Sequence, residues 1–215
     1  MSNGDNPEGE LADPIEKERF RPLPLCASAG VVIVLLVCVS SFSIRYARVE
    51  DAIILISALG GSVSSDDVPI IGPTRIHFGS PLPGSPWREV TDEHLVAALP
   101  LLSHLTRVGT VSFRDCPGVT RASITQILRV FELRELFVAG TSISNEALVD
   151  ISKEKSIERL DLSETDVTAE GLQVLGEMPR LRELWLSDSM LSESESRQVR
   201  QWLPNVRIVM SKIPR

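Results

Sequence analysis

The sequence is short of aromatic residues and of basic charge, and each shortage narrows the possible functions. Phe, Trp and Tyr make up 5% of the 215 residues, whereas hydrophobic residues make up 43%. Leu, Ile and Val must therefore build most of the core. The net charge is −7, from 22 basic and 29 acidic side chains. This balance leaves no basic footprint of the kind that neutralises phosphates, so we expect no nucleic-acid partner.

Cysteine frameworks and catalytic motifs are also lacking. Of the three cysteines, Cys26 and Cys38 fall in one apolar segment and Cys116 lies far away, which indicates neither a disulfide framework nor a C-x-x-C metal site. The sequence contains no H-E-x-x-H, G-x-S-x-G, P-loop or Rossmann glycine motif. His94 has acidic neighbours, but adjacent positions on a helix point in different directions. We therefore predict a protein that is not an enzyme and uses no cofactor or metal.

The N-terminal 44 residues predict a tail and a membrane anchor. Residues 1–21 are polar and acidic, which predicts a disordered tail because little can be buried there. Residues 22–44 are 23 consecutive uncharged residues, enough for one transmembrane helix. A cleaved signal peptide and a buried helix of a soluble protein are the alternatives. A signal peptide, however, has a shorter apolar region followed by small residues at a cleavage site.

The charges beside this segment predict how the chain is oriented in the membrane. Lys17, Arg19 and Arg21 precede the segment, whereas only Arg45 and Arg48 follow it closely. The positive-inside rule then places the N-terminus in the cytoplasm and the larger C-terminal part outside the cytoplasmic membrane.

Residues 45–63 predict an amphipathic capping helix and a short strand. Val49, Ala52, Ile53, Ile56 and Leu59 recur at helical spacing, and Gly60–Gly61 supply a stop. This helix could cap the end of a repeat stack, extend the membrane helix or lie on the bilayer. We favour the cap, because its polar face carries acidic residues rather than a lysine-rich band. Residues 62–89 are rich in Gly, Pro and Ser, and residues 64–107 predict an irregular first repeat.

Internal repeats dominate residues 108–210. LRELFVAGT (133–141), IERLDLSET (157–165) and LRELWLSDS (181–189) align without gaps at intervals of 24 residues, and VGTVSFRDC (108–116) and VRIVM (206–210) are weaker copies. Each nine-residue copy is followed by a helical pattern. In L-x-x-L-x-L the last two apolar residues share one face of a strand. One unit cannot bury that face alone, so stacked units must form a continuous core.

Two further positions repeat along the chain. Small residues occupy the ninth position of the unit, where they can bond to backbone that leaves the strand: Cys116, Thr141, Thr165 and Ser189. This position predicts that Cys116 is a buried structural thiol rather than a nucleophile. Hydroxyl residues precede each helical pattern and predict helix N-caps: Thr91, Thr120, Ser144, Thr168 and Ser192.

The pattern L-x-x-L-x-L-x-x-T followed by a helix opened by T-x-E-x-L resembles the leucine-rich-repeat family, nearest its ribonuclease-inhibitor-like and cysteine-containing classes. The layout also resembles bacterial single-span, membrane-anchored leucine-rich-repeat proteins. The resemblance covers about residues 46–210. It implies an α/β fold: a short right-handed solenoid with parallel strands on one face and helices on the other, preceded by the transmembrane helix. It also implies protein binding through the strand face.

Side chains that alternate with the core leucines mark the predicted partner-binding surface. We expect exposed side chains in each strand, with Phe137 and Trp185 as a recognition patch around Asp161, because aromatic and arginine side chains most often anchor interfaces. The predicted surface comprises Ser112, Arg114, Glu135, Phe137, Arg159, Asp161, Glu183 and Trp185. Its alternating charges could also form a self-neutralising ladder. We predict a module that binds a protein or peptide; the alternative is a structural envelope protein that self-associates and has no dedicated ligand.

Overall fold

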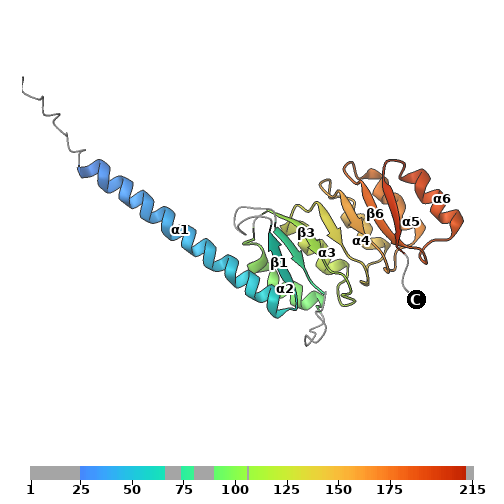
Figure 1. Ribbon diagram of the computed structural model, residues 1–215, viewed down its shortest axis with the longest axis horizontal. Coiled ribbons are helices and arrows are strands. Elements are labelled where there is room, and N and C mark those ends of the chain that lie inside the picture. Colours follow the sequence, from blue (N-terminus) through green and yellow to red (C-terminus); the bar gives the residue numbers. More distant parts are fainter. Residues whose placement is uncertain (1–24, 66–73, 80–89, 106, 212–215) are drawn as a thin grey trace, which may run out of the picture. The chain divides into compact units, whose positions relative to one another are not determined.

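The computed structural model describes residues 25–65, 74–79, 90–105 and 107–211. The chain divides into two compact units, residues 1–41 and residues 42–215. The predicted disordered tail and the first three residues of the predicted membrane segment lie outside the described residues. The second unit is a mixed α/β fold built on a seven-stranded, mostly parallel sheet (Figure 1).

The strands follow one another across the sheet in the order of the sequence. Their order is β1-β2-β3-β4-β5-β6-β7, in which β1 runs antiparallel to β2 and all later neighbours are parallel. The strands are β1 (Ser62–Ser65), β2 (Thr74–His77), β3 (Val108–Ser112), β4 (Glu135–Phe137), β5 (Arg159–Asp161), β6 (Glu183–Ser187) and β7 (Arg207–Ser211). Each predicted repeat copy therefore contains one strand.

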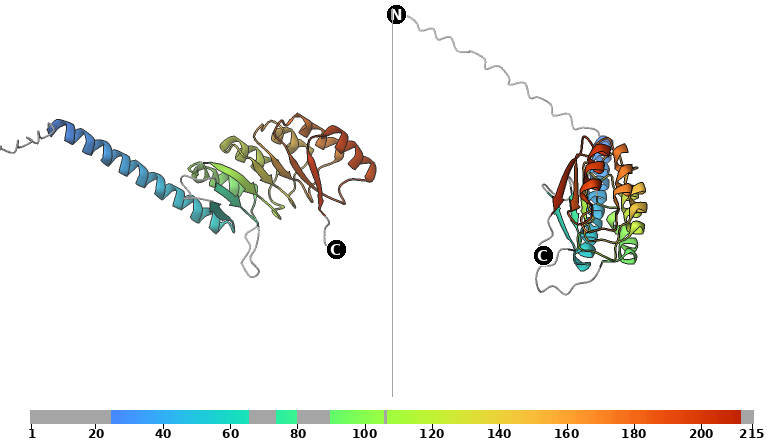
Figure 2. Two further views of the ribbon diagram at one scale, coloured as in Figure 1. Left: turned by 45° about the horizontal axis from the view of Figure 1, so that its top comes forward. Right: turned by 90° about the vertical axis from the view of Figure 1, so that its right-hand side faces the viewer.

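Helical segments connect consecutive parallel strands from β2 onward and stack along one face of the sheet (Figures 1 and 2). The helices are α1 (Leu25–Ala58), α2 (Asp92–Leu102), α3 (Arg121–Val130), α4 (Asn145–Ile151), α5 (Ala169–Leu172) with the 3₁₀ helix η1 (Gln173–Glu177), and α6 (Glu193–Trp202). All five predicted N-cap residues occupy the N-cap position of α2 to α6. Thr120 and Ser192 accept a hydrogen bond from the first turn of their helices, which satisfies a backbone donor that the helix leaves free.

The register of the sheet confirms the 24-residue interval. Leu136 pairs with Leu160, and Leu160 with Leu184, so equivalent residues of successive copies lie side by side. The apolar residues at the repeated strand and helix positions are all buried: Leu136, Val138, Leu148, Ile151, Leu160, Leu162, Leu172, Leu175, Leu184, Leu186, Val199 and Leu203. Cys116 is buried as well, in agreement with the structural role predicted for it.

The core continues into the C-terminal part of α1. Val49, Ala52, Ile56 and Leu59 are buried and belong to the same hydrophobic cluster as the strands, as expected of a helix that covers the end of a stack. Gly60, in the left-handed region with φ of 78°, follows the helix, as the sequence predicts.

The predicted membrane helix and the predicted capping helix belong to one uninterrupted helix, α1. No helix within the described ranges combines the length and the apolar composition needed to cross a membrane.

Candidate binding surface on the strand face

Parallel pairing brings the predicted surface residues into two columns that cross the sheet. The central column places Phe137 of β4 beside Asp161 of β5, and Asp161 beside Trp185 of β6. Ser112 of β3 pairs with Phe137 at one end of this column. The flanking column runs through Thr110, Glu135, Arg159, Glu183 and Arg207. Residues 25 or 24 positions apart in the chain thus become neighbours.

Phe137 and Trp185 contact each other across the strand that separates them. Their ring centroids are 6.0 Å apart and the ring planes are inclined by 57°, a tilted geometry that aromatic pairs favour. Strands lie about 4.8 Å apart, so two rings standing upright on β4 and β6 would be separated by about 9.6 Å. The shorter distance means that both side chains lean over β5, and therefore over Asp161.

Arg114 completes the cluster from the loop that follows β3. Its guanidinium Nη2 lies 2.6 Å from Oδ2 of Asp161, and its Cζ lies over the Phe137 ring, 5.2 Å from the centroid. The Asp161 side chain is 5% exposed and that of Arg114 is 52% exposed. Asp161 Oδ1 also accepts a hydrogen bond from the Ser163 amide. Both oxygens of the buried carboxylate therefore accept a hydrogen bond, while about half of the arginine side chain stays exposed.

The flanking column forms a chain of ion pairs. Glu135 accepts hydrogen bonds from Thr110 Oγ1 at 2.9 Å and from Arg159 Nη1 at 2.8 Å. Arg159 Nε lies 3.6 Å from Glu183 Oε2, and Arg207 Nη1 lies 3.2 Å from Glu183 Oε1. These charges compensate one another, as the alternative interpretation of the sequence expected. The column therefore offers a partner little uncompensated charge.

Two residues of the predicted surface, Ser112 and Asp161, are buried, and so are Thr110, Ser163 and Ser187 on the same face of the strands. The prediction of exposure was wrong for these residues. Alternation determines on which face of a strand a side chain lies, but not how far the neighbouring side chains extend over it. Short side chains on this face lie between larger ones, and Asp161 lies beneath two aromatic rings and a guanidinium. The accessible part of the predicted surface is carried by Arg114, Arg159 and the half-buried Glu135, Phe137, Glu183 and Trp185.

A cavity of about 530 Å³ lies beside the aromatic cluster. Arg114, Phe137 and Ser112 line it together with four residues that the predicted surface did not include: Ser62, His77, Phe78 and Asp115. His77 pairs with Ser112 and so extends the central column onto β2. Burial lowers the pKa of His77, and the positive charges of Arg75 and Arg114 lower it further, which favours the neutral imidazole.

Of the surface residues that the prediction omitted, only Arg207 could have been found from the repeat pattern. Arg207 was visible in principle, because the fifth copy, VRIVM, places it 24 residues after Glu183. His77 and Ser62 were not, because β1 and β2 carry no copy of the repeat and their register follows only from the folded sheet.

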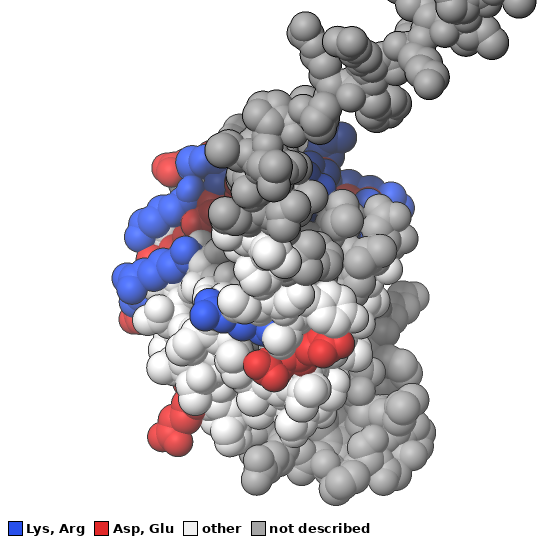
Figure 3. Space-filling model, turned by 90° about the vertical axis from the view of Figure 1, so that its left-hand side faces the viewer, with Lys and Arg blue, Asp and Glu red and all other residues white. Residues whose placement is uncertain are grey.

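The described residues contain no group of three or more His, Cys, Asp or Glu side chains that could hold a metal ion. On the end of the molecule shown in Figure 3, basic side chains alternate with acidic ones along one margin instead of forming a continuous basic stripe. No protein-family model matches the chain.

Proposed function

We propose that this chain is a membrane-anchored leucine-rich-repeat protein without enzymatic activity, whose strand face binds a protein or peptide. Five observations support the repeat assignment. The strands recur at intervals of 24 or 25 residues, and their leucines share one hydrophobic core. The helices return along one face of the sheet, N-cap residues recur before them, and α1 covers one end of the stack. In this assignment residues 46–210 form a short right-handed solenoid.

The observation that carries the binding proposal is the contact of Phe137 and Trp185 above Asp161. Large aromatic side chains held half-exposed by a sheet lose little conformational entropy on binding, and with arginine they are the most frequent interface anchors. Arg114 is held in place by Asp161 and stacks on Phe137, so it is pre-organised too. The neighbouring cavity could accept one side chain of the partner. Because the flanking ion pairs are internally satisfied, we propose a partner recognised mainly through apolar and aromatic contacts around Arg114.

A photo-cross-linking amino acid placed at Phe137 in the intact cell tests this proposal. We expect adducts with a heterologous protein, and no such adducts from the same amino acid at Val149, an exposed apolar position on helix α4. The combined Phe137→Ala and Trp185→Ala variant should abolish capture of that protein. The Val130→Ala and Val149→Ala pair, also exposed apolar positions on helices, is the matched control.

The same experiment separates binding from a structural role. Adducts that contain only copies of this chain would favour the alternative, a self-associating envelope protein without a dedicated ligand. Absence of any adduct at Phe137 would contradict both.

The membrane anchor is a further part of the proposal and rests on residues 22–44, which carry no charge. We propose a single-pass protein with its N-terminus in the cytoplasm and the repeats outside the cytoplasmic membrane. Alkaline extraction should leave the full-length chain in the membrane fraction. Protease added to intact cells with a permeable outer envelope should degrade the repeats; protection of the repeats would reverse the orientation, and release by alkali would exclude the anchor.

A further inference from the structure

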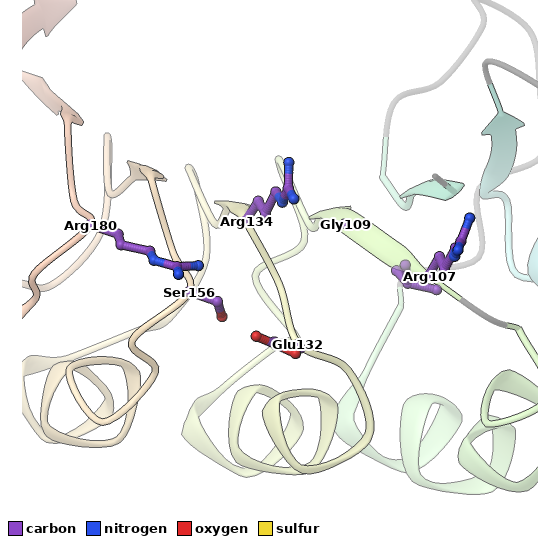
Figure 4. Close-up of a pocket in the computed structure, with 7 residues that line it drawn as sticks. Arg107, Gly109, Glu132, Arg134, Ser156 and Arg180 are labelled. Carbon is purple, nitrogen blue, oxygen red and sulfur yellow. The ribbon is translucent and has the colours of Figure 1, made fainter. Parts of the chain in front are cut away.

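A second cavity lies at the edge of the sheet where the chain enters strands β3 to β6 (Figure 4). Its volume is about 530 Å³, and its polar lining comes from the residues that precede these strands: Arg107, Glu132, Arg134, Ser156 and Arg180. Arg114, Phe137, Asp161 and Trp185 do not line it, so this cavity is separate from the binding surface proposed above.

The lining is basic in an acidic protein. It carries three arginines and one glutamate, hence a formal charge of +2, whereas the whole chain carries −7. Arg134 and Arg180 form no ion pair with any residue that the structure describes, in contrast to Arg114, Arg121, Arg159 and Arg207, which all do. Arginine presents planar pairs of donors that match oxyanions. Two such groups beside one cavity are therefore a ready source of binding energy for an anion.

A buried hydroxyl group without a partner lies at the same place. Ser156 is 7% exposed, and its Oγ makes no hydrogen bond to any described group. Figure 4 shows its side chain directed into the cavity, with Glu132 facing it and the guanidinium of Arg180 reaching above it. Leaving a buried hydroxyl unsatisfied costs about 1–3 kcal/mol, so folded proteins usually provide it with a partner. A ligand oxygen in the cavity would be such a partner.

Gly109 lines the cavity and places no side chain in it. Its carbonyl accepts a hydrogen bond from the Arg134 amide, so the two residues lie at the same level of the sheet. A side chain added at Gly109 would find no atom within 4 Å of its Cβ, and would project into free space.

The volume of the cavity is larger than an inorganic ion requires and lies within the usual range for small organic ligands.

From this lining we infer that the strand-entry edge binds a small phosphorylated molecule, with Arg180 contacting the phosphate oxygens and Ser156 Oγ donating a hydrogen bond to one of them. The Arg134 guanidinium, which Figure 4 shows directed away from Ser156, turns toward the phosphate on binding. The two guanidinium groups of Arg134 and Arg180 complement a phosphate dianion, and the remaining volume accepts the organic part. Lys155 takes no part, because its Nζ donates to the carbonyls of Ser152 and Glu177.

Calorimetric titration of the full-length chain, purified in a non-ionic detergent, tests this inference with inorganic phosphate, glycerol phosphate and acetate at constant ionic strength. We expect saturable binding of both phosphates, tighter for glycerol phosphate, and none of acetate. The Arg134→Gln and Arg180→Gln variants should each weaken binding by about tenfold, as loss of a charge-assisted contact predicts. Arg200→Gln, which removes an equal charge from the exposed surface of α6, should leave binding unchanged.

The Ser156→Ala variant distinguishes a ligand contact from a purely structural hydroxyl. We expect phosphate binding to weaken while the free energy of unfolding stays unchanged or rises, because a buried unsatisfied group is removed. No saturable binding of phosphate, equal binding of acetate, equal weakening by Arg200→Gln, or unchanged binding by Ser156→Ala would each overturn the inference. None of these results bears on the strand face, whose test is cross-linking at Phe137.

Discussion

Arg114 and Asp161 are separated by 47 positions in the chain, yet Arg114 Nη2 and Asp161 Oδ2 lie 2.6 Å apart. The carboxylate is buried and the guanidinium is half-exposed. This asymmetry determines what each partner does. The arginine supplies a partner to the buried carboxylate beneath Phe137 and Trp185, and the carboxylate holds the arginine at the centre of the proposed binding surface.

Replacing Arg114 by Ala should destabilise the fold by about 1–3 kcal/mol, because a buried acceptor loses its strongest partner. Asp161→Asn should cost less, since it removes the charge and leaves most of the shape. Urea unfolding of both single variants and the double variant measures the coupling between them. A double variant whose loss equals the sum of the two single losses would show that the pair is not coupled.

Asp92 connects consecutive repeats, and its removal should be costly. Its carboxylate accepts hydrogen bonds from the Thr120 amide and hydroxyl and from the Ser123 hydroxyl at the start of the next helix. Although burial raises the pKa of Asp92, these hydrogen bonds outweigh burial and hold it below its ordinary value. We expect Asp92→Ala to lower the free energy of unfolding by about 3 kcal/mol, because several charge-assisted bonds are lost together.

The adjacent Glu93 provides the control for Asp92. It is exposed in the first turn of α2, and Glu93→Ala should cost only about 0.5 kcal/mol through the helix dipole. Equal losses for the two variants, measured by chemical denaturation, would contradict a special role of Asp92.

Gly79 should tolerate no side chain. Its φ is 80°, and a Cβ there would lie 2.2 Å from the carbonyl oxygen of Arg114 and 2.3 Å from Cys116 Sγ. Gly79→Ala should therefore destabilise the fold by more than about 2 kcal/mol, through backbone strain and steric conflict. Gly109→Ala, which meets no atom within 4 Å, is the comparison and should change the thermal midpoint little. A small loss of stability in the Gly79→Ala variant would contradict this prediction, because it would show that β2 and the loop after β3 can move apart at little cost in free energy.

Protonation of Asp150, on helix α4, should lower the free energy of unfolding in acid. Hydrogen bonds from Arg121 and Lys153 lower the pKa of Asp150 from 3.8 to about 2. Because the folded-state pKa lies below the unfolded-state value, this contribution is complete above about pH 4 and is lost as the pH falls from 4 to 2. Its size should be about 1 kcal/mol or less, since both cations are largely solvated.

Denaturation at a series of pH values measures this contribution. Asp150→Asn should flatten the dependence between pH 4 and pH 2, whereas Asp51→Asn, at an exposed carboxylate of α1, should not. An unchanged slope in the Asp150→Asn variant would contradict the assignment.

Short-range patterns in the sequence were sufficient to predict much of the fold. The L-x-x-L-x-L spacing predicted strands β4, β5 and β6, and the hydroxyl residues before each helical pattern predicted the five N-caps. Both depend on local geometry: the two-residue period of a strand and the unpaired amides of a first helical turn. The same locality limited the prediction of the site. Alternation placed Asp161 on the outer face of β5 but gave no information about the side chains leaning over it from β4 and β6.

The sequence by itself determined the repeat interval, the residues of the core and the columns in which Phe137, Asp161 and Trp185 meet. Repetition fixes these, because equivalent residues of stacked units must fall into register. Only the tertiary structure decided which of those side chains are accessible, how Arg114 reaches Asp161 and how Asp92 bonds to the next helix. It also decided that Ser156 Oγ, beside Arg134 and Arg180, makes no hydrogen bond to any residue that the structure describes. These contacts join residues from different units, and their distances depend on side-chain size and loop path, which no periodic pattern encodes.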